Sequence, residues 1–171
     1  MALIAIVGAT NANSYVTVLE AGTYLWSSVP RGKQRPWQEA TVEEKETMLI
    51  TATRLIDRMV SWHSISADTD QALAWPMSNA KTRKGSPIDN DVIPDDIKNA
   101  TTEYALALLE TQGTFSGGIA DLASFTDGNV SMTFRDSAPT SPTEKMPKNV
   151  RQYLRHYGFI AGDTVIGIVR V

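Results

Sequence analysis

Two Thr-x-x-Glu motifs, each followed by apolar residues at helical spacing, constrain the fold of this chain more than any other feature of its sequence. In such a capping box the threonine side chain accepts a hydrogen bond from a backbone amide of the first helical turn. The glutamate side chain in return accepts one from the threonine amide. Thr17 and Glu20 form the first box. They predict a helix of about three turns over residues 17–27.

The second box, Thr41 and Glu44, begins the clearest predicted helix, over residues 42–60. Apolar residues recur there every three or four positions, which places them on one face. A third helix is predicted over residues 94–111, because Pro94 suits a first turn and two aspartates follow it at the positive end of the helix dipole. These helices indicate a mainly α fold, a small helical bundle with long ordered loops and a few short β-strands.

The pattern divides the chain into three regions. Residues 1–13 are predicted to form an extended arm with a strand-like apolar run, residues 14–112 the helical core, and residues 113–171 a C-terminal region. Within the core, residues 61–93 show no sustained period and predict a long ordered loop. Loops of this length in compact domains are usually functional or bound to a partner.

The C-terminal region is predicted to combine a short strand, a linker, a short helix and a strand-like tail. Alternating residues over 129–135 indicate a short strand, and residues 137–142 form a Ser/Pro/Thr linker. Residues 147–157 predict a short last helix that Gly158 ends. Residues 162–171 form a β-branched, strand-like tail.

Both ends of the chain are apolar and strand-like, yet neither has a hairpin partner next to it in the sequence. An uncovered apolar edge strand tends to aggregate. Each end therefore pairs with the other or adds to a sheet on a neighbouring protein, and we expect the C-terminal tail to dock on a partner. The expected docking residues are Val165, Ile166, Ile168, Val169 and Val171.

Composition excludes several classes of protein. The 171 residues carry a formal net charge of −3, which gives no overall attraction to nucleic acid or anionic membranes. The absence of cysteine excludes disulfides and thiolate metal sites and is compatible with a reducing cytoplasm. No segment approaches the ~20 apolar residues that span a membrane. We expect a soluble protein made in a cytoplasm, with no membrane partner.

A search for catalytic or ligand-binding motifs finds no set of residues that can cooperate. The glycine motifs that cradle nucleotides are absent. His63 and His156 lack a partner at metal-ligand spacing. Ser78 and Lys81 match the S-x-x-K pattern of penicillin-binding enzymes, but no companion motif follows. We therefore expect a protein that is not an enzyme and has no catalytic residues, metal or cofactor.

Several residues are predicted to be structural anchors of the loop and the core. Tyr104 lies in the most apolar stretch of the third helix, and Asp57 lies one turn from Arg54, so an ion pair there or to the loop between Trp62 and Trp75 is expected. Trp62 and Trp75 are expected to hold the loop against the bundle. The six predicted anchors are Trp62, Trp75, Pro76, Tyr104, Asp57 and Arg54.

Basic residues beside tryptophans suggest binding of single-stranded nucleic acid, in which cations neutralise phosphates and aromatic rings stack on bases. The alternative is that the tryptophans pack in the core and the charges are solvated. The overall acidity and the spread of the basic groups favour this alternative. The groups are Arg31, Lys33 and Arg35 before Trp37, and the candidate DNA-facing residues Lys81, Arg83 and Lys84 after Trp75.

Four segments of the chain, spread over residues 14–109, resemble a known family. They are residues 14–25, 44–57, 71–76 and 93–105. In their order and spacing the chain is similar to the DnaT-like single-stranded DNA-binding family, whose members resemble head–tail connector proteins of tailed phages. The C-terminal third matches that pattern poorly.

The resemblance implies a structural virion protein, a head–tail adaptor in the neck of the particle, assembled in the host cytoplasm. Copies would form a ring, commonly twelvefold, between the portal protein and a tail or nozzle protein. The ring would extend the channel through which genomic DNA passes. The alternative function is that of a single-stranded DNA-binding accessory protein of replication or of the primosome.

Overall fold

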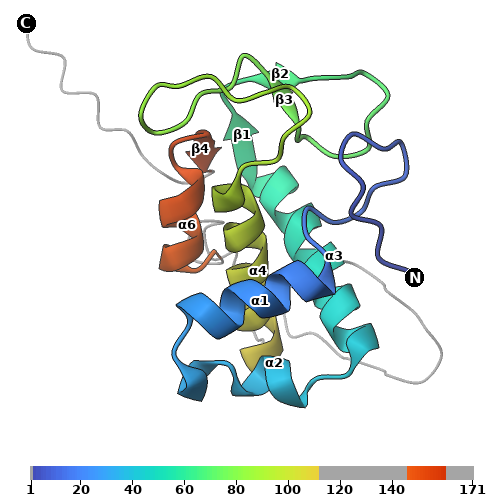
Figure 1. Ribbon diagram of the computed structural model, residues 1–171, viewed down its shortest axis with the longest axis vertical. Helices are drawn as coiled ribbons and strands as arrows, with labels where there is room; N and C mark the ends of the chain where they lie inside the picture. Colours follow the sequence, from blue (N-terminus) through green and yellow to red (C-terminus); the bar gives the residue numbers. More distant parts are fainter. Residues whose placement is uncertain (1, 112–145, 161–171) are drawn as a thin grey trace, which may run out of the picture.

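The computed structural model describes residues 2–111 and 146–160, and in these ranges the protein is mainly helical, as the sequence predicts (Figure 1). A central helix, α4, packs against helices on several sides and occupies the middle of the bundle. The helices are α1 (Val18–Ser28), the 3₁₀ turn η1 (Arg31–Lys33), α2 (Arg35–Glu39), α3 (Val42–Met59), α4 (Asp95–Glu110) and α6 (Lys148–Leu154). The strands are β1 (Val60–Trp62), β2 (Ile65–Ser66), β3 (Met77–Ser78) and β4 (Gly158–Ile160).

Both predicted capping boxes are present, and they fix where α1 and α3 begin. The Thr17 side chain accepts from the Glu20 amide at 3.2 Å, and the Glu20 carboxylate accepts from the Thr17 amide at 2.9 Å. Thr41 and Glu44 form the same pair of bonds at 3.2 and 2.7 Å. Each box satisfies backbone donors that a helix start otherwise leaves unpaired. The sequence therefore predicts these two starts to the residue.

The core is built around α4, which packs against α1, α2, α3 and α6. Ile97, Ala100 and Tyr104 are buried on α4 and meet the buried Leu49 and Ile56 of α3 in one apolar cluster. The first turn of α4 differs slightly from the prediction, because Pro94 is the N-cap and the helix begins at the next residue. Five of the six residues from Tyr104 to Leu109 are buried, as expected for the stretch of this helix that is apolar almost all round.

Two small antiparallel ribbons lie at one end of the bundle (Figure 1). β1 continues directly from α3 and pairs with β4, with Val60 opposite Ile160 and Trp62 opposite Gly158. β2 pairs with β3, with Ile65 opposite Ser78. The predicted loop over residues 61–93 therefore contains short strands that fold it back on itself, which the sequence pattern does not show.

Gly158 has a different role from the one predicted. It does not end α6, whose last helical residue is Leu154 with Arg155 as the C-cap; it is the first residue of β4. A Cβ atom at this position would lie 2.6 Å from Cγ1 of Val60 and 2.7 Å from the carbonyl oxygen of Ser61. The glycine is required because the two strands approach each other too closely for a side chain.

The strand predicted near the N-terminus is wrong for the described residues 2–7, which form no strand. Asn13 replaces a strand partner, because its side-chain oxygen accepts from the Ile4 amide at 2.7 Å and its amide donates to the Ile4 carbonyl at 2.9 Å. Ile6 and Val7 remain exposed. The predicted strand over 129–135, the linker over 137–142 and the docking tail over 162–171 lie outside the described residues.

Glu20 also joins α1 to α4. Its carboxylate accepts from the Lys98 ammonium at 2.8 Å while the other oxygen holds the capping box. Desolvation opposes the charged form, but the hydrogen bonds from Lys98 and Thr17 outweigh it and lower the pKa of Glu20 to about 2. The carboxylate therefore stays charged at nearly every pH at which the protein is handled.

This pKa predicts a measurable acid dependence of stability. Because the folded pKa lies below the ordinary value of 4.5, the charged carboxylate stabilises the fold above that pH, and its contribution is lost as the pH falls toward 2. We expect Glu20→Gln to lower the free energy of unfolding at pH 7 by less than about 1 kcal/mol, since both side chains of the pair are partly exposed and solvent screens their charges. Urea titrations of the parent and the variant at pH 7 and pH 2.5 test this. The same loss of unfolding free energy in the variant at both pH values would contradict it.

Candidate nucleic-acid interface

Several stretches of this acidic chain lack acidic residues, and two of these stretches together carry six cations. Residues 71–88 and 146–160 hold six of the sixteen lysines and arginines and none of the nineteen aspartates and glutamates. Everything else in the chain therefore carries a clear excess of negative charge. The six cations are Lys81, Arg83, Lys84, Lys148, Arg151 and Arg155.

The fold brings these two segments into contact. The Arg83 guanidinium donates to the Gln152 carbonyl at 2.8 Å and lies 3.4 Å from the Asp96 carboxylate. On the same side, Nε2 of the His156 ring lies 3.1 Å from the Lys81 carbonyl oxygen. The loop that carries Lys81 and Lys84 therefore rests on the C-terminal turn of α6, where unpaired helix carbonyls favour a cation.

α6 is itself held by polar contacts at its other side. The Tyr24 hydroxyl of α1 lies 2.9 Å from the Tyr153 hydroxyl and donates to Glu103 of α4 at 2.5 Å. Asn149 also donates to Glu103. Burial, together with these bonds and the nearby carboxylate, raises the pKa of Tyr24, so its hydroxyl stays protonated. This network fixes which face of α6 meets solvent.

That solvent face carries positive charge. Lys148, Arg151 and Arg155 follow each other at i, i+3 and i+7, a spacing that puts them on one side of the helix. Lys148 and Arg155 are exposed, as are Lys81 and Lys84 on the adjoining loop. Arg83 differs from these because its contacts with α6 and Asp96 give it a positioning role.

Two aromatic rings are exposed on the β1–β4 ribbon and the turn after β1, and one of them, His63, lines the same hollow as Lys81. Phe159, at the centre of β4, is 60% exposed, and the ring of His63 meets it edge-on with centroids 4.7 Å apart. The His63 amide donates to the Tyr157 carbonyl at 2.9 Å, which extends the β1–β4 ribbon by one step and fixes the ring pair. We call the exposed cations Lys81, Lys84, Lys148 and Arg155, together with the rings of Phe159 and His63, the basic face.

The tryptophans next to the basic groups in sequence are not available for stacking. Trp75 and Trp37 are buried, and Trp62 is partly buried with its ring edge-on to Trp75 at 5.8 Å. Core packing, the expected alternative for these residues, is therefore what the structure has. Trp26 differs, because it is 65% exposed and lies 5.1 Å from the Arg31 guanidinium.

The predicted anchor Asp57 fastens the tryptophan loop to the bundle through hydrogen bonds. Its carboxylate accepts from the hydroxyl of Tyr15 and, at 3.2 Å, from the amide of Ala74, whereas an ion pair was expected. The same hydroxyl accepts from the Trp75 amide at 3.3 Å. Burial raises the pKa of Asp57, while the bonds from Tyr15 and Ala74 act in the opposite direction.

The other predicted anchors lie in different environments. Trp75, Pro76 and Tyr104 are buried. Burial raises the pKa of Tyr104 to about 12, so its hydroxyl stays neutral. Arg54 lies on the exposed side of α3. The anchors therefore do not converge on one site, and among them Asp57 bonds directly to the loop that leads to Lys81 and Lys84.

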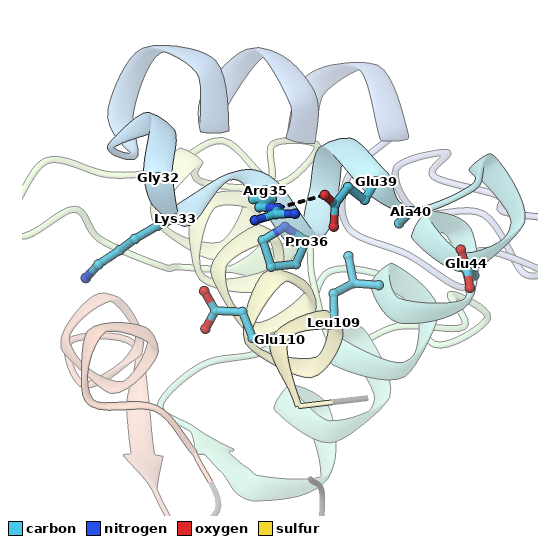
Figure 2. A pocket seen from close by; sticks show the side chains of 9 residues that line it. All are labelled: Gly32, Lys33, Arg35, Pro36, Glu39, Ala40, Glu44, Leu109 and Glu110. Carbon is cyan, nitrogen blue, oxygen red and sulfur yellow. Dashed lines mark hydrogen bonds and ion pairs between the residues drawn. The ribbon is translucent and has the colours of Figure 1, made fainter. Parts of the chain in front are cut away.

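A hollow of about 510 Å³ beside α2 is a poor place for phosphates (Figure 2). Arg35, which lines it, forms an ion pair with Glu39 at 2.7 Å. Glu44 and Glu110 also line it, and their carboxylates oppose a polyanion. Lys33 is the remaining cation there. Charge therefore distinguishes this hollow from the basic face.

Within residues 2–111 and 146–160, no group of histidines and carboxylates is arranged to hold a metal ion. In the same part of the chain, no helix combines the length and the apolar character that crossing a bilayer requires.

The family model described as "Putative DnaT-like ssDNA binding protein" matches residues 1–171. The chain belongs to this family. The match covers the whole chain, including the C-terminal third that the resemblance in sequence left out. Neither the curated proteins nor the solved structures gave a match.

Membership of the DnaT-like family corrects one expectation. The interpretation of the chain as a structural virion part, a connector between portal and tail, is overturned, because the description of the matching family names single-stranded DNA binding. The resemblance itself pointed to the right family. The homo-oligomeric state stays a prediction from the sequence.

The sequence signal for the site was present but incomplete. Lys81, Arg83 and Lys84 were selected as candidate DNA-facing residues, and two of them lie on the basic face. The cations of α6 and the rings of His63 and Phe159 were missed. The signal that could have found them is the absence of acids from residues 71–88 and 146–160.

Proposed function

We propose that this protein binds single-stranded DNA through the basic face and performs no catalysis. The observation that carries the proposal is the meeting of two acid-free segments, separated in sequence, at one surface of an otherwise acidic protein. Gathering like charges on one surface does not stabilise a fold, because the charges repel each other. The description of the DnaT-like family supports the same function.

The geometry suggests how a strand would be held. Lys148 begins α6 and Arg155 is its C-cap, so the two are seven residues and roughly 10 Å apart along the helix axis and can neutralise phosphates at separate points of an extended backbone. Lys81 and Lys84 continue the charge onto the loop. Phe159 and His63 offer exposed ring faces on which bases can stack, and such stacking tolerates any sequence.

Binding to a fluorescently labelled oligonucleotide, followed by anisotropy at several salt concentrations, tests the proposal. We expect the triple variant Lys81→Gln, Lys84→Gln, Arg155→Gln to bind more weakly and to reduce the slope of log K against log salt. The expected reduction is about 2, since each phosphate contact on a single strand contributes ~0.7. Phe159→Ala should weaken binding with the slope unchanged, because stacking releases no counterions.

A matched control keeps the net charge equal. Lys33→Gln, Arg35→Gln, Arg58→Gln removes three exposed cations that lie elsewhere on the molecule. We expect the slope of log K against log salt for this control to match that of the parent protein to within the ~0.7 that one phosphate contact contributes. Equal weakening by both triple variants would mean that net charge alone governs binding. Failure of the parent protein to bind single-stranded DNA at low salt would refute the function.

A further inference from the structure

One carboxylate, that of Asp96 in the first turn of α4, contacts both parts of the basic face: the loop that carries Lys81 and Lys84, and the segment from α6 to β4. It lies 3.4 Å from the Arg83 guanidinium of the loop and accepts from the Tyr157 hydroxyl, just before β4, at 3.1 Å. We propose that Asp96 is a positioning residue for DNA binding, which holds the loop cations in line with the cations and rings of the α6–β4 segment. This inference rests on the proposed function and adds to it the residue that aligns the site.

The tip of the loop is a closed turn, so one attachment is enough to position it. The Gly85 amide donates to the Thr82 carbonyl, and the Thr82 amide donates to the Ser86 carbonyl, each at 2.8 Å. Arg83 and Lys84 lie between these bonded residues. A contact that fixes the Arg83 side chain therefore also fixes the direction in which the turn presents Lys84.

The Arg83 side chain attaches this turn to two helices at once. It donates to the Gln152 carbonyl at 2.8 Å and to the Tyr153 carbonyl at 3.5 Å, near the C-terminal end of α6. Its Nε lies 3.4 Å from the Asp96 carboxylate of α4. A guanidinium is a planar fork whose donors point in fixed directions, so the carbonyls and the carboxylate together determine how it lies. A lysine ammonium, a single point of charge, does not reproduce this arrangement.

Tyr157 connects the same carboxylate to the exposed rings. Burial, together with the charge of Asp96 and the hydrogen bond to it, raises the pKa of Tyr157 to about 12, so the hydroxyl stays protonated and remains a donor. The Tyr157 carbonyl accepts from the His63 amide at 2.9 Å, and Phe159 follows two residues later in β4. Asp96 therefore acts on the ring pair of the basic face through Tyr157.

The place of Asp96 in the fold suits it to this role. It lies in the first turn of α4, where unpaired backbone amides and the helix dipole stabilise a negative charge. α4 is also the helix that packs against α1, α2, α3 and α6, so its backbone is a fixed support. The loop and the α6–β4 segment are thus both bonded to the centre of the bundle through one side chain.

Alignment and simple electrostatics predict opposite results for the removal of this charge. An acid close to a DNA-binding surface repels phosphates, so its loss ordinarily strengthens binding. It would also free the Arg83 guanidinium for a phosphate and raise the slope of log K against log salt by ~0.7. If Asp96 aligns the site, Asp96→Asn weakens binding although it makes the protein less acidic, because a site that must be ordered during binding loses affinity.

Anisotropy of a fluorescently labelled single-stranded oligonucleotide, measured with the full chain at several salt concentrations, provides the test. We expect Asp96→Asn to weaken binding by about threefold or more, without a rise in the salt slope. Asp95→Asn is the matched control, because it removes the same charge one residue earlier from an exposed side chain, and it should bind at least as tightly as the parent. Arg83→Lys keeps the positive charge but should weaken binding nearly as much as Arg83→Gln. Circular dichroism at the assay temperature establishes that each variant is folded.

A double variant, Asp96→Asn with Arg83→Gln, shows whether the two residues act together. Its loss of binding free energy should be smaller than the sum of the two single losses, because their mutual contact can be lost only once.

The outcomes separate the two proposals. Tighter binding by Asp96→Asn, a salt slope raised by ~0.7, or equal weakening by Asp95→Asn would overturn the positioning role and leave the DNA-binding function standing. Arg83→Lys binding like the parent, or fully additive losses in the double variant, would do the same. If the parent protein does not bind single-stranded DNA at low salt, both proposals are wrong.

Discussion

Trp75→Ala is expected to lower the free energy of unfolding by about 3–5 kcal/mol, the usual cost of removing a large buried aromatic side chain. Trp75 is 1% exposed and contacts Trp62 and Tyr157 through its ring. Removal of the indole therefore leaves a cavity between the tryptophan loop and the β1–β4 ribbon. Both packing partners lose contacts at once, and the surrounding backbone can fill the space only in part.

Urea denaturation followed by far-ultraviolet circular dichroism measures this change. Trp26→Ala is the control, because Trp26 is 65% exposed and a surface substitution should alter stability by no more than about 0.5 kcal/mol. An unchanged midpoint for Trp75→Ala would mean that the loop does not depend on the indole. A loss as large for Trp26→Ala would mean that exposure in this fold does not predict the energetic role of a tryptophan.

The helices were predictable because their signals are local. The capping boxes at Thr17 and Thr41 depend on residues three positions apart, and the apolar spacing after each depends on one turn of helix. The start of α4 was predicted to within one residue from Pro94 for the same reason. Local hydrogen-bonding patterns of this kind survive almost any tertiary arrangement.

The pairing of β1 with β4 was not predictable, because it joins Val60 to Ile160 across a long stretch of chain. Neither strand is longer than three residues, too short for an alternating pattern to stand out. The prediction of a strand within residues 2–7 was wrong for the opposite reason. It has a clear apolar pattern, but Asn13 takes the hydrogen bonds that a ladder would need.

Only some residues of the basic face were predictable from the sequence. Proximity in sequence joined Lys81 and Lys84 to Trp75, but the ribbon buries Trp75 and exposes Phe159 instead. Which ring reaches solvent depends on the side of the ribbon it occupies, and that depends on the pairing register. Because successive strand residues point to opposite faces, Phe159 points away from the buried side of the ribbon that Gly158 and Ile160 occupy.

Gly158→Ala is therefore expected to affect both stability and DNA binding. The new Cβ would lie 2.6 Å from Cγ1 of Val60 and 2.7 Å from the Ser61 carbonyl oxygen, closer than any real contact. The Val60 side chain can turn aside, but the backbone oxygen cannot move without opening the ribbon. Overpacking of this kind costs about 1–3 kcal/mol. Because the ribbon carries Phe159 and His63, the ring pair should be displaced as well.

The control is Gly32→Ala, since a Cβ there meets nothing within 4 Å and the backbone lies outside the region that strains other residues. We expect the control to be as stable as the parent or slightly more so, because alanine restricts the unfolded chain. For Gly158→Ala, DNA binding measured where the variant is fully folded should fall while the salt slope stays unchanged. That combination means that the cations remain in place and the stacking platform has moved. A loss of stability with unaltered binding would show instead that the β1–β4 ribbon holds the fold without contributing rings to the DNA site.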